Sequence, residues 1–557
     1  MKNKDQSEQF AYDYIIIGAG ASSPIVANSL VSDGYSVLLL EAGHEVAKDS
    51  KDVWDPQRWF KVQADETIEW GYTSIPQKNL NNRVLSMQQS RCLGGCTIHN
   101  AMVYVRGGQT TYDYWEKELG CKGWNYKSLE PLFEELEKEI GITRGKKDDL
   151  VSSFFHAAEN NGIPYNKHYN QHQTEYGCVP FQFTLEEDGS ELKRTTSYAK
   201  YIGDGSKLKG LTVVTGALVQ QILFDTDDEI KAIGVSYENS ENELVTVHCA
   251  KEIILSAGTI ASPKILLQSG VGPKAELEAL HIKVIKDLPA VGKNFYDDMG
   301  LTALFTQKQG LPPQPYGFLT SGIFASDHPN FDPKSPEYAQ VNLEMQICSS
   351  DLPGAPQIPL GIDEITNIGH DQSPNLIPLP QGDAKSANGT LPYYSVGVAA
   401  LHLKSRGSIT LASSNPNDLP LIDPNYLSDP ADIEQCKNAV KLALKIGWDK
   451  NLDDWRGLPL LPTAFPCATI LGGWGWIGKQ STFDQYLEYC VRQFALSIQH
   501  YIGTCSMGQV VDADLKVYGI SGLRVIDASV APTPVTGNTG GVSYVIGAKG
   551  AQLLKKQ

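Results

Sequence analysis

One segment near the N-terminus, residues 14–41, constrains the fold more than any other part of the chain. Tyr14-Ile-Ile-Ile-Gly18 is an apolar run that enters a glycine turn, which is typical of a strand buried in a parallel sheet. An apolar-periodic helix through Leu30 follows, and a second strand, Ser36-Val-Leu-Leu-Leu40, ends in Glu41. This order predicts the βαβ unit of a dinucleotide-binding domain and therefore an α/β fold.

The turn of this unit carries the residues expected to hold the dinucleotide. Gly18 makes the tight turn, and Gly20 lets the backbone approach a pyrophosphate. Ala21 and Ser22 lead into the helix, whose N-terminus favours negative charge. Glu41, 23 positions after Gly18, has the spacing of an acid that accepts from a ribose hydroxyl. This motif alone does not distinguish FAD from NAD.

Length and charge exclude several classes of protein. A chain of 557 residues predicts about two to four domain-sized units. The net charge of −17 and the absence of a basic stripe argue against a nucleic-acid partner. We find no secretory signal and no apolar run of the ~18 residues of a membrane span, so we expect a cytoplasmic protein. No metal site is expected, because Cys92 and Cys96 lack a second ligand pair.

Several further motifs follow in a characteristic order. They occupy residues 90–107, 258–272, 500–508, 522–530 and 537–539. Together they resemble the signatures of the glucose–methanol–choline (GMC) oxidoreductases, flavoenzymes that oxidise alcohols. The resemblance spans nearly the whole chain and implies that the nucleotide is FAD.

The first of these motifs is named here the flavin loop (residues 90–107). Its double glycine, Gly94 and Gly95, lets the backbone lie against a flat ring system where a Cβ would collide. The polar Thr97 and Asn100 are expected to meet the phosphates and the ring edge. By resemblance, the cofactor contacts of this loop are Leu93, Gly95, Thr97, His99, Asn100, Ala101, Met102 and Val103.

His99 departs from the usual family pattern, in which an aliphatic residue precedes the asparagine. The segment instead resembles that of choline oxidases, whose matching histidine is joined covalently to the flavin 8α-methyl. Imidazole is a competent nucleophile for that methyl. The alternative is a histidine that packs beside the flavin without a bond.

The resemblance also implies a catalytic pair near the C-terminus. An alcohol proton is too tightly held to leave unaided as hydride departs, so a base such as histidine is needed. His500 stands at the position of the family base, and Asn538 at that of its partner. We expect His500 to take the hydroxyl proton, Asn538 to orient the oxygen, and the hydride to pass to flavin N5.

Four further cofactor contacts follow from the resemblance alone. Val219 falls where the family backbone contacts the adenine, Asp527 and Ala528 where it closes the nucleotide site, and Gly540 at a flavin contact. Asp527 has an alternative role as a helix N-terminal acid, with Ser529 as a nearby cap.

The resemblance implies a discontinuous Rossmann-like FAD-binding domain, residues 10–300 and 500–557, and a substrate-binding domain, residues 301–499, built on an antiparallel sheet backed by helices. Local patterns agree with this α+β second domain. We expect strands in 393–402 and 407–411, a helix in 430–448 and a long surface loop in 351–391.

The substrate and the electron acceptor stay open at this stage. We expect a small alcohol, with oxygen or another acceptor to reoxidise the flavin, and the sequence leaves the oligomeric state undetermined. Phe465, Trp474 and Trp476 are candidates for an apolar pocket or for ordinary core. The alternatives on the same scaffold are a flavin-containing lyase, resembling hydroxynitrile lyases, and a photodecarboxylase.

Overall fold

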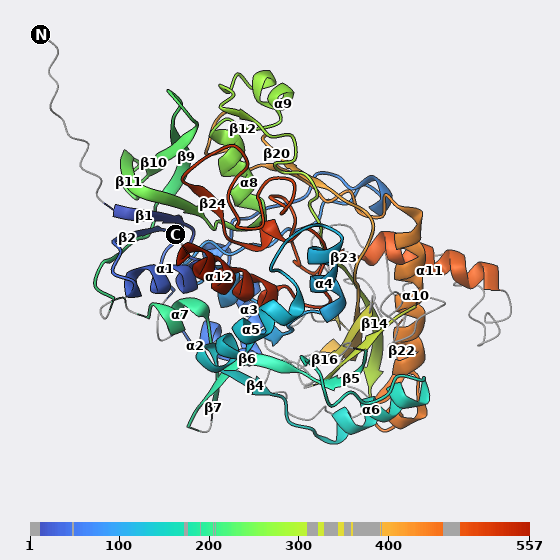
Figure 1. Ribbon diagram of the computed structural model, residues 1–557. Coiled ribbons are helices and arrows are strands. Elements are labelled where there is room, and N and C mark those ends of the chain that lie inside the picture. Colours follow the sequence, from blue (N-terminus) through green and yellow to red (C-terminus); the bar gives the residue numbers. More distant parts are fainter. Residues whose placement is uncertain are drawn as a thin grey trace, which may run out of the picture.

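Two seven-stranded sheets organise the molecule, one at the left and one at the lower right of Figure 1. The computed structural model describes residues 12–46, 50–171, 176–189, 191–203, 205, 208–308, 321–327, 343–349, 358–359, 390–391, 393–460 and 480–556. No helix of this described part is long and apolar enough to cross a membrane.

The first sheet joins the two ends of the chain. Its strands, in order, are β8 (Leu211–Val214), β2 (Val37–Leu40), β1 (Tyr12–Ile17), β11 (Leu244–Leu255), β10 (Lys231–Glu238) and β9 (Leu218–Asp225), with β24 (Leu523–Val525) also paired to β11. Neighbouring strands pair in parallel among β8, β2, β1, β11 and β24. The sheet continues with antiparallel pairs from β11 to β10 and from β10 to β9. Since β24 comes from the C-terminal region, this layer is assembled from distant segments.

The predicted βαβ unit is present. β1 leads through the glycine turn into α1 (Ser23–Ser32), which carries its proline in the first turn, where the missing N–H costs little. Gly18 has φ +92°, and a Cβ there would lie 2.5 Å from the Ser256 carbonyl oxygen. The C-terminal helix α12 (Gly540–Leu554) packs against α1 and α5 (Tyr126–Ile140).

The second sheet is antiparallel throughout. Its strands, in order, are β22 (Arg456–Leu460), β14 (Met299–Gln307), β19 (Tyr393–Ala400), β16 (Leu343–Ser349), β15 (Ser321–Ala325) and β5 (Gly177–Pro180), with β23 (Leu496–Ser497) paired to β14. β5 thus joins this sheet from within the range expected for the FAD-binding domain. The division of the chain into two domains stays a prediction.

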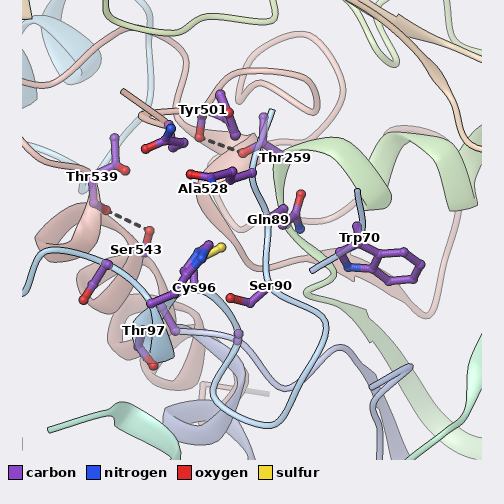
Figure 2. Close-up of a pocket in the computed structure, with 18 of the residues that line it drawn as sticks. Trp70, Gln89, Ser90, Cys96, Thr97, Thr259, Tyr501, Ala528, Thr539 and Ser543 are labelled. Carbon is purple, nitrogen blue, oxygen red and sulfur yellow. Dashed lines mark hydrogen bonds between the residues drawn. The ribbon is translucent and has the colours of Figure 1, made fainter. Parts of the chain in front are cut away.

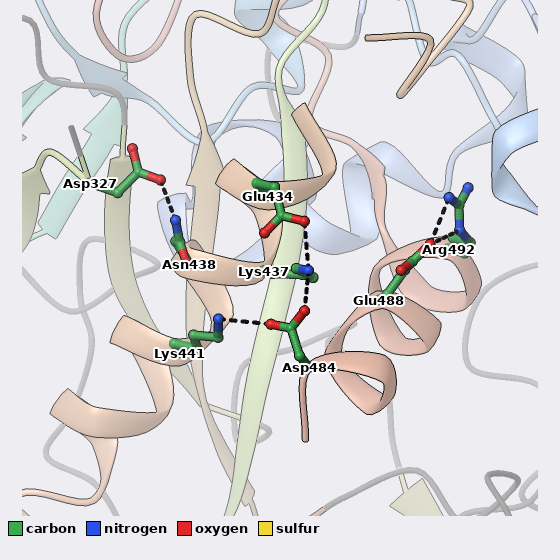
Figure 3. A network of polar contacts seen from close by, with 8 residues as sticks. All are labelled: Asp327, Glu434, Lys437, Asn438, Lys441, Asp484, Glu488 and Arg492. Carbon is green, nitrogen blue, oxygen red and sulfur yellow. Dashed lines mark hydrogen bonds and ion pairs between the residues drawn. The ribbon is translucent and has the colours of Figure 1, made fainter. Parts of the chain in front are cut away.

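Helix α10 (Pro430–Gly447) covers β14 and β19, and α11 (Gln480–Phe494) packs against α10. Polar contacts join these two helices (Figure 3). Lys437, with a side chain only 3% exposed, pairs with Glu434 at 2.7 Å and with Asp484 at 2.5 Å. Lys441 reaches the other oxygen of Asp484 at 3.0 Å.

The remaining elements connect the sheets or form small sheets of their own. They are α2 (Lys51–Trp54), α3 (Trp59–Gln63), α4 (Gln109–Lys117), α6 (Asp149–Asn160), α7 (Ser197–Tyr201), α8 (Gly258–Gln268), α9 (Lys274–Ala279), β3 (Val103–Tyr104), β4 (Ile142–Arg144), β6 (Gln182–Asp188), β7 (Glu191–Arg194), β12 (Val271–Gly272), β13 (Lys286–Asp287), β17 (Ile358–Pro359), β18 (Thr390–Leu391), β20 (Ser408–Thr410) and β21 (Leu421–Asp423).

The local predictions for the second half of the chain are confirmed where the structure describes it. β19, β20 and α10 fall within the expected ranges 393–402, 407–411 and 430–448. The expected loop 351–391 is described only at the two short strands β17 and β18. Phe465, Trp474 and Trp476 lie outside the described residues.

Candidate active site

A cavity of about 510 Å³ extends from the glycine turn to the second sheet. Figure 2 shows part of its wall, with Thr97, Thr259 and Ser543 contributed by widely separated parts of the chain. The sequence-predicted residues that line it are Gly18, Gly20, Ala21, Ser22, Glu41, Gly95, Thr97, His99, Asn100, Ala101, Met102, Val103, Val219, His500, Asp527, Ala528, Asn538 and Gly540. Leu93 does not line the cavity, because its side chain is buried in the core.

The glycine turn and the flavin loop lie in direct contact at one end of the cavity. A Cβ on Gly95, which has φ +52°, would lie 2.8 Å from the Gly20 Cα. A Cβ on Gly20 would meet no atom of the described chain within 4 Å, so the backbone there is open to the cavity. This is the close backbone approach that a pyrophosphate requires, and these residues fit FAD.

Glu41 stands at the end of β2 with its carboxylate already oriented. The backbone N–H groups of Ala19 and Gly43 donate to its two oxygens at 2.9 and 2.8 Å. Burial raises the pKa of Glu41, and these two hydrogen bonds oppose the rise. Because an ionised carboxylate offers about four acceptor sites, it retains capacity for a ribose hydroxyl.

A buried arginine that the sequence did not point to holds the flavin loop. Arg194, at the end of β7, donates from Nη1 to the backbone oxygens of Thr97 at 3.1 Å and Asn100 at 2.7 Å. It also donates to the side-chain oxygen of Asn100 at 2.7 Å. Burial lowers the pKa of Arg194 to about 9. The Asn100 oxygen is thus engaged within the protein, which leaves its amide N–H groups for a ligand.

His99 lines the cavity beside a buried acid. Its Nδ1 lies 2.7 Å from Glu69 Oε1, within ion-pair distance, but the two are not aligned as a directed hydrogen bond. The other Glu69 oxygen accepts from the Gln89 backbone at 3.0 Å. Burial alone would lower the pKa of His99, but Cys96 and Glu69 outweigh it and raise the pKa to about 9.

The imidazole of His500 is held from both ring nitrogens. Nδ1 lies 2.9 Å from Asp298 Oδ2, and Nε2 lies 3.1 Å from Asn538 Nδ2. Since a carboxylate only accepts, Nδ1 carries the hydrogen in this pair, and in the neutral imidazole Nε2 accepts from the Asn538 amide. The structure therefore brings the two predicted residues together, and the neutral form of His500 presents Nε2 as its basic nitrogen.

Three acids surround this histidine. Burial alone would lower the pKa of His500, but the hydrogen bond to Asp298 and the charges of Asp298, Glu344 and Asp297 outweigh it and raise the pKa. Asp298 also accepts from the Tyr296 hydroxyl, and Asp297 accepts from the His500 backbone N–H at 2.8 Å. The sequence analysis missed these acids, because no local motif connects residues 297, 298 or 344 with residue 500.

Asp527 has the alternative role that the sequence left open. Its carboxylate accepts from the Ser529 backbone at 2.8 Å at the start of the 3₁₀ turn Ala528–Val530. It also accepts from the Gly258 backbone at 2.9 Å and the Ser262 hydroxyl at 2.6 Å, at the start of α8. Asp527 is therefore a helix N-terminal acid that also lines the cavity, and its nucleotide contact stays a prediction.

Comparison with known proteins agrees with the motifs. Family profiles described as GMC oxidoreductase match residues 12–299 and 404–547. The chain is 31% identical to an oxygen-dependent choline dehydrogenase of Pseudomonas savastanoi pv. phaseolicola, over 98% of this chain and 94% of that protein. It is 30% identical to an alcohol dehydrogenase [acceptor] of Pseudomonas putida, over 98% of this chain and 96% of that protein.

Solved structures share the fold. Pyridoxine 4-oxidase from Mesorbium loti superposes with a TM-score of 0.79 at 23% identity, over 98% of this chain and 99% of that one. A point variant of the formate oxidase of Aspergillus oryzae RIB40 superposes with a TM-score of 0.79 at 21% identity, over 98% of both chains. On the matched profiles and relatives, the chain belongs to the GMC oxidoreductases, the family of FAD-dependent alcohol oxidoreductases that its motifs indicated.

Proposed function

We propose that this protein oxidises the CH–OH group of a small alcohol to a carbonyl, with His500 as the base. The observation that supports this most directly is the placement of His500 Nε2 in the cavity wall, 3.1 Å from the Asn538 amide. FAD bound in this cavity would supply the hydride acceptor at N5. The names of the matched relatives, which include choline and alcohol dehydrogenases, support the same reaction class.

The chain's own residues divide the proton chemistry between them. Nε2 of His500 accepts the hydroxyl proton, and the Asn538 amide then donates to the substrate oxygen without competing for that proton. Asp298 stabilises the imidazolium that forms, because its carboxylate already faces Nδ1 at 2.9 Å.

The test is anaerobic flavin reduction by a panel of alcohols, in the dark. The wild-type protein should bleach, and admission of air then tests dioxygen as the acceptor through peroxide formation. His500→Ala should bind FAD and stay yellow but bleach at least about 10²-fold more slowly. His156→Ala, on the exposed face of α6, serves as the matched control. Rapid bleaching of His500→Ala would refute the assignment, and no bleaching of the wild type would favour a lyase or a photodecarboxylase.

We also propose that His99 binds the flavin 8α-methyl covalently. Glu69 faces Nδ1, which leaves Nε2 for the bond to the methyl carbon. Bond formation would release one imidazole hydrogen and one methyl hydrogen as protons, and the two electrons would pass to the flavin and then to dioxygen. After acid precipitation the wild-type pellet should be yellow and the supernatant colourless. His99→Ala should release its flavin; a yellow wild-type supernatant would refute the bond.

A further inference from the structure

A buried carboxylate stands behind the histidine of the flavin loop. Glu69 pairs with Ser90 in an isolated antiparallel bridge, and its side chain is only 10% exposed. The side chain of His99 is 5% exposed and lies in the cavity wall, whereas Glu69 is not part of that wall. Any effect of Glu69 on a bound group therefore passes through His99.

The two side chains face each other, each with one atom that nothing else satisfies. The Gln89 backbone N–H donates to Glu69 Oε2 at 3.0 Å, which leaves Oε1 for the histidine. Oε1 lies 2.7 Å from His99 Nδ1, and neither atom has a hydrogen-bond partner of its own among the described residues. A separation of 2.7 Å is that of a charge-assisted pair, so Nδ1 carries a hydrogen and Nε2 is the nitrogen left for the cavity.

The other titratable groups around this pair carry no positive charge. Cys92 and Cys96 face it from the flavin loop, and Tyr501 approaches from the C-terminal part of the chain. Burial raises the pKa of Cys92 and of Tyr501, so both stay uncharged near neutral pH. Among the described residues around the His99 ring, Glu69 is therefore the carboxylate that can balance a positive charge on it.

We propose that Glu69 is the positioning residue for covalent attachment of FAD at His99, an inference that rests on the proposed bond to the 8α-methyl. With a carbon on Nε2 and a hydrogen on Nδ1, the imidazole ring is a cation. Glu69 Oε1 stabilises this charge and accepts the Nδ1 hydrogen, which is the imidazole hydrogen that bond formation releases. The Nε2–carbon bond forms while the Nδ1–H bond and one methyl C–H bond break. Both hydrogens leave as protons, and dioxygen accepts the electron pair through the flavin.

The same pair gives attachment a pH dependence. Burial alone would lower the pKa of His99, but Cys96 and Glu69 outweigh it and raise the pKa to about 9. Only the neutral ring has a lone pair on Nε2, so the rate of attachment should increase as the pH rises through about 9. Without the charge of Glu69 that pKa falls, so the rising limb should move to lower pH even though attachment becomes slower.

The test measures attachment in the absence of any substrate. Protein produced in a riboflavin-starved host is mixed with FAD in air, and covalent flavin in the acid-precipitated pellet is followed over time from about pH 6 to about pH 10. Glu69→Gln keeps an acceptor oxygen but removes the charge. It should bind FAD as the wild type does but attach it at least about tenfold more slowly at its plateau, with the limb at lower pH.

Two further variants accompany this comparison. Glu69→Asp keeps the charge on a shorter side chain and should attach FAD at a rate between those of the wild type and Glu69→Gln. Glu66→Gln removes an exposed acid of the same segment and serves as the matched control, with the rate and the limb of the wild type. Quenching of flavin fluorescence on mixing shows that each variant has folded and binds FAD.

The outcomes separate this inference from the bond on which it rests. A colourless wild-type pellet would refute the His99 bond and the role of Glu69 with it. A yellow pellet that forms equally fast in Glu69→Gln, or an unmoved limb, would overturn the role of Glu69 while the bond stands. If Glu69→Gln does not bind FAD, Glu69→Asp decides, and a rate equal to that of the wild type would overturn the role. Alcohol oxidation does not enter any of these measurements.

Discussion

The orientation of one imidazole determines whether this cavity contains a usable base. His500 is held by a carboxylate on one nitrogen and an amide on the other, so its ring cannot turn without breaking a hydrogen bond at 2.9 or 3.1 Å. The residue before it, Gln499, has φ +60°, an uncommon backbone conformation for a side chain other than glycine. Asp298 thus acts as a positioning residue for His500.

Replacing Asp298 with asparagine should move the pH profile. Only the neutral imidazole accepts a proton, so activity is lost as the pH falls through the pKa of His500. The Asp298 charge raises that pKa, and Asp298→Asn should therefore shift the acid limb of kcat/KM to lower pH and reduce kcat at least about tenfold. Asp297→Asn, next to the His500 backbone N–H, should shift the limb less. An unmoved acid limb in Asp298→Asn would contradict this account.

Gly95 and Gly20 lie in contact, but alanine at the two positions should have different effects, one on stability and one on FAD binding. Gly95→Ala places a Cβ against Gly20 at a positive φ, so it should lower the melting temperature even without flavin. The Cβ of Gly20→Ala meets no atom of the described residues within 4 Å, so this substitution should leave the flavin-free melting temperature unchanged but weaken FAD binding at least about tenfold. Both are measured in a His99→Ala background, which makes the flavin removable. Equal effects of the two substitutions on the flavin-free protein would show that the contact does not distinguish these positions.

At the scale of elements, the packing of α10 against α11 includes the buried ammonium group of Lys437. Burial alone would lower the pKa of Lys437, but Asp484 and Glu434 outweigh it and raise the pKa. Removal of one carboxylate leaves this charge less well compensated. The neighbouring pair Glu488–Arg492, at 2.8 Å within α11, is more exposed than Lys437 and has the setting of a surface contact (Figure 3).

Asp484→Asn should therefore destabilise the protein by about 1–3 kcal/mol, because Lys437 loses one of its two partners. Glu488→Gln should lower the free energy of unfolding by only about 0–1 kcal/mol, because it removes a surface ion pair. Thermal unfolding followed by circular dichroism should show a melting temperature lower by about 1–3 °C for the first variant only. Equal shifts in the two variants would show that Lys437 is not dependent on Asp484.

At the scale of the whole molecule, the C-terminal segment completes the layer that the N-terminus begins. β24 pairs with β11, and α12 packs on α1, with the Ser22 hydroxyl donating to the Ser543 carbonyl at 2.7 Å. Most residues of α12 are buried. The same segment contributes Asn538 and Gly540 to the cavity, so the first sheet and the site both depend on it.

Deleting residues 540–557 should prevent formation of a stable FAD-binding protein. Each large apolar side chain of α12 that loses its burial costs about 1.5–3 kcal/mol, and several together exceed the ~5–15 kcal/mol stability of a typical domain. Deleting only residues 555–557 should have little effect, because Lys555 is exposed and its pair with Asp33 at 3.5 Å is a surface contact. The measurements are yield of soluble protein and bound flavin; a yellow product of the longer deletion would contradict the expectation.

The sequence by itself determined the nucleotide-binding unit, the family and the pair His500 and Asn538. Each is encoded by residues close together in the chain, such as the turn at Gly18 and the motif that begins at His500. The βαβ unit is visible without a fold because strand and helix periodicity act over short separations, whereas the family and the pair follow from the resemblance of short motifs to those of the GMC oxidoreductases.

Only the tertiary structure decided which acids face these histidines and which arginine holds the flavin loop. Asp298 lies 202 positions from His500, and Arg194 lies 94 positions from Asn100. Glu344 reaches the cavity through its place on β16 of the second sheet. Charge pairing across such separations depends on how the two sheets pack, and no local pattern in the chain records it.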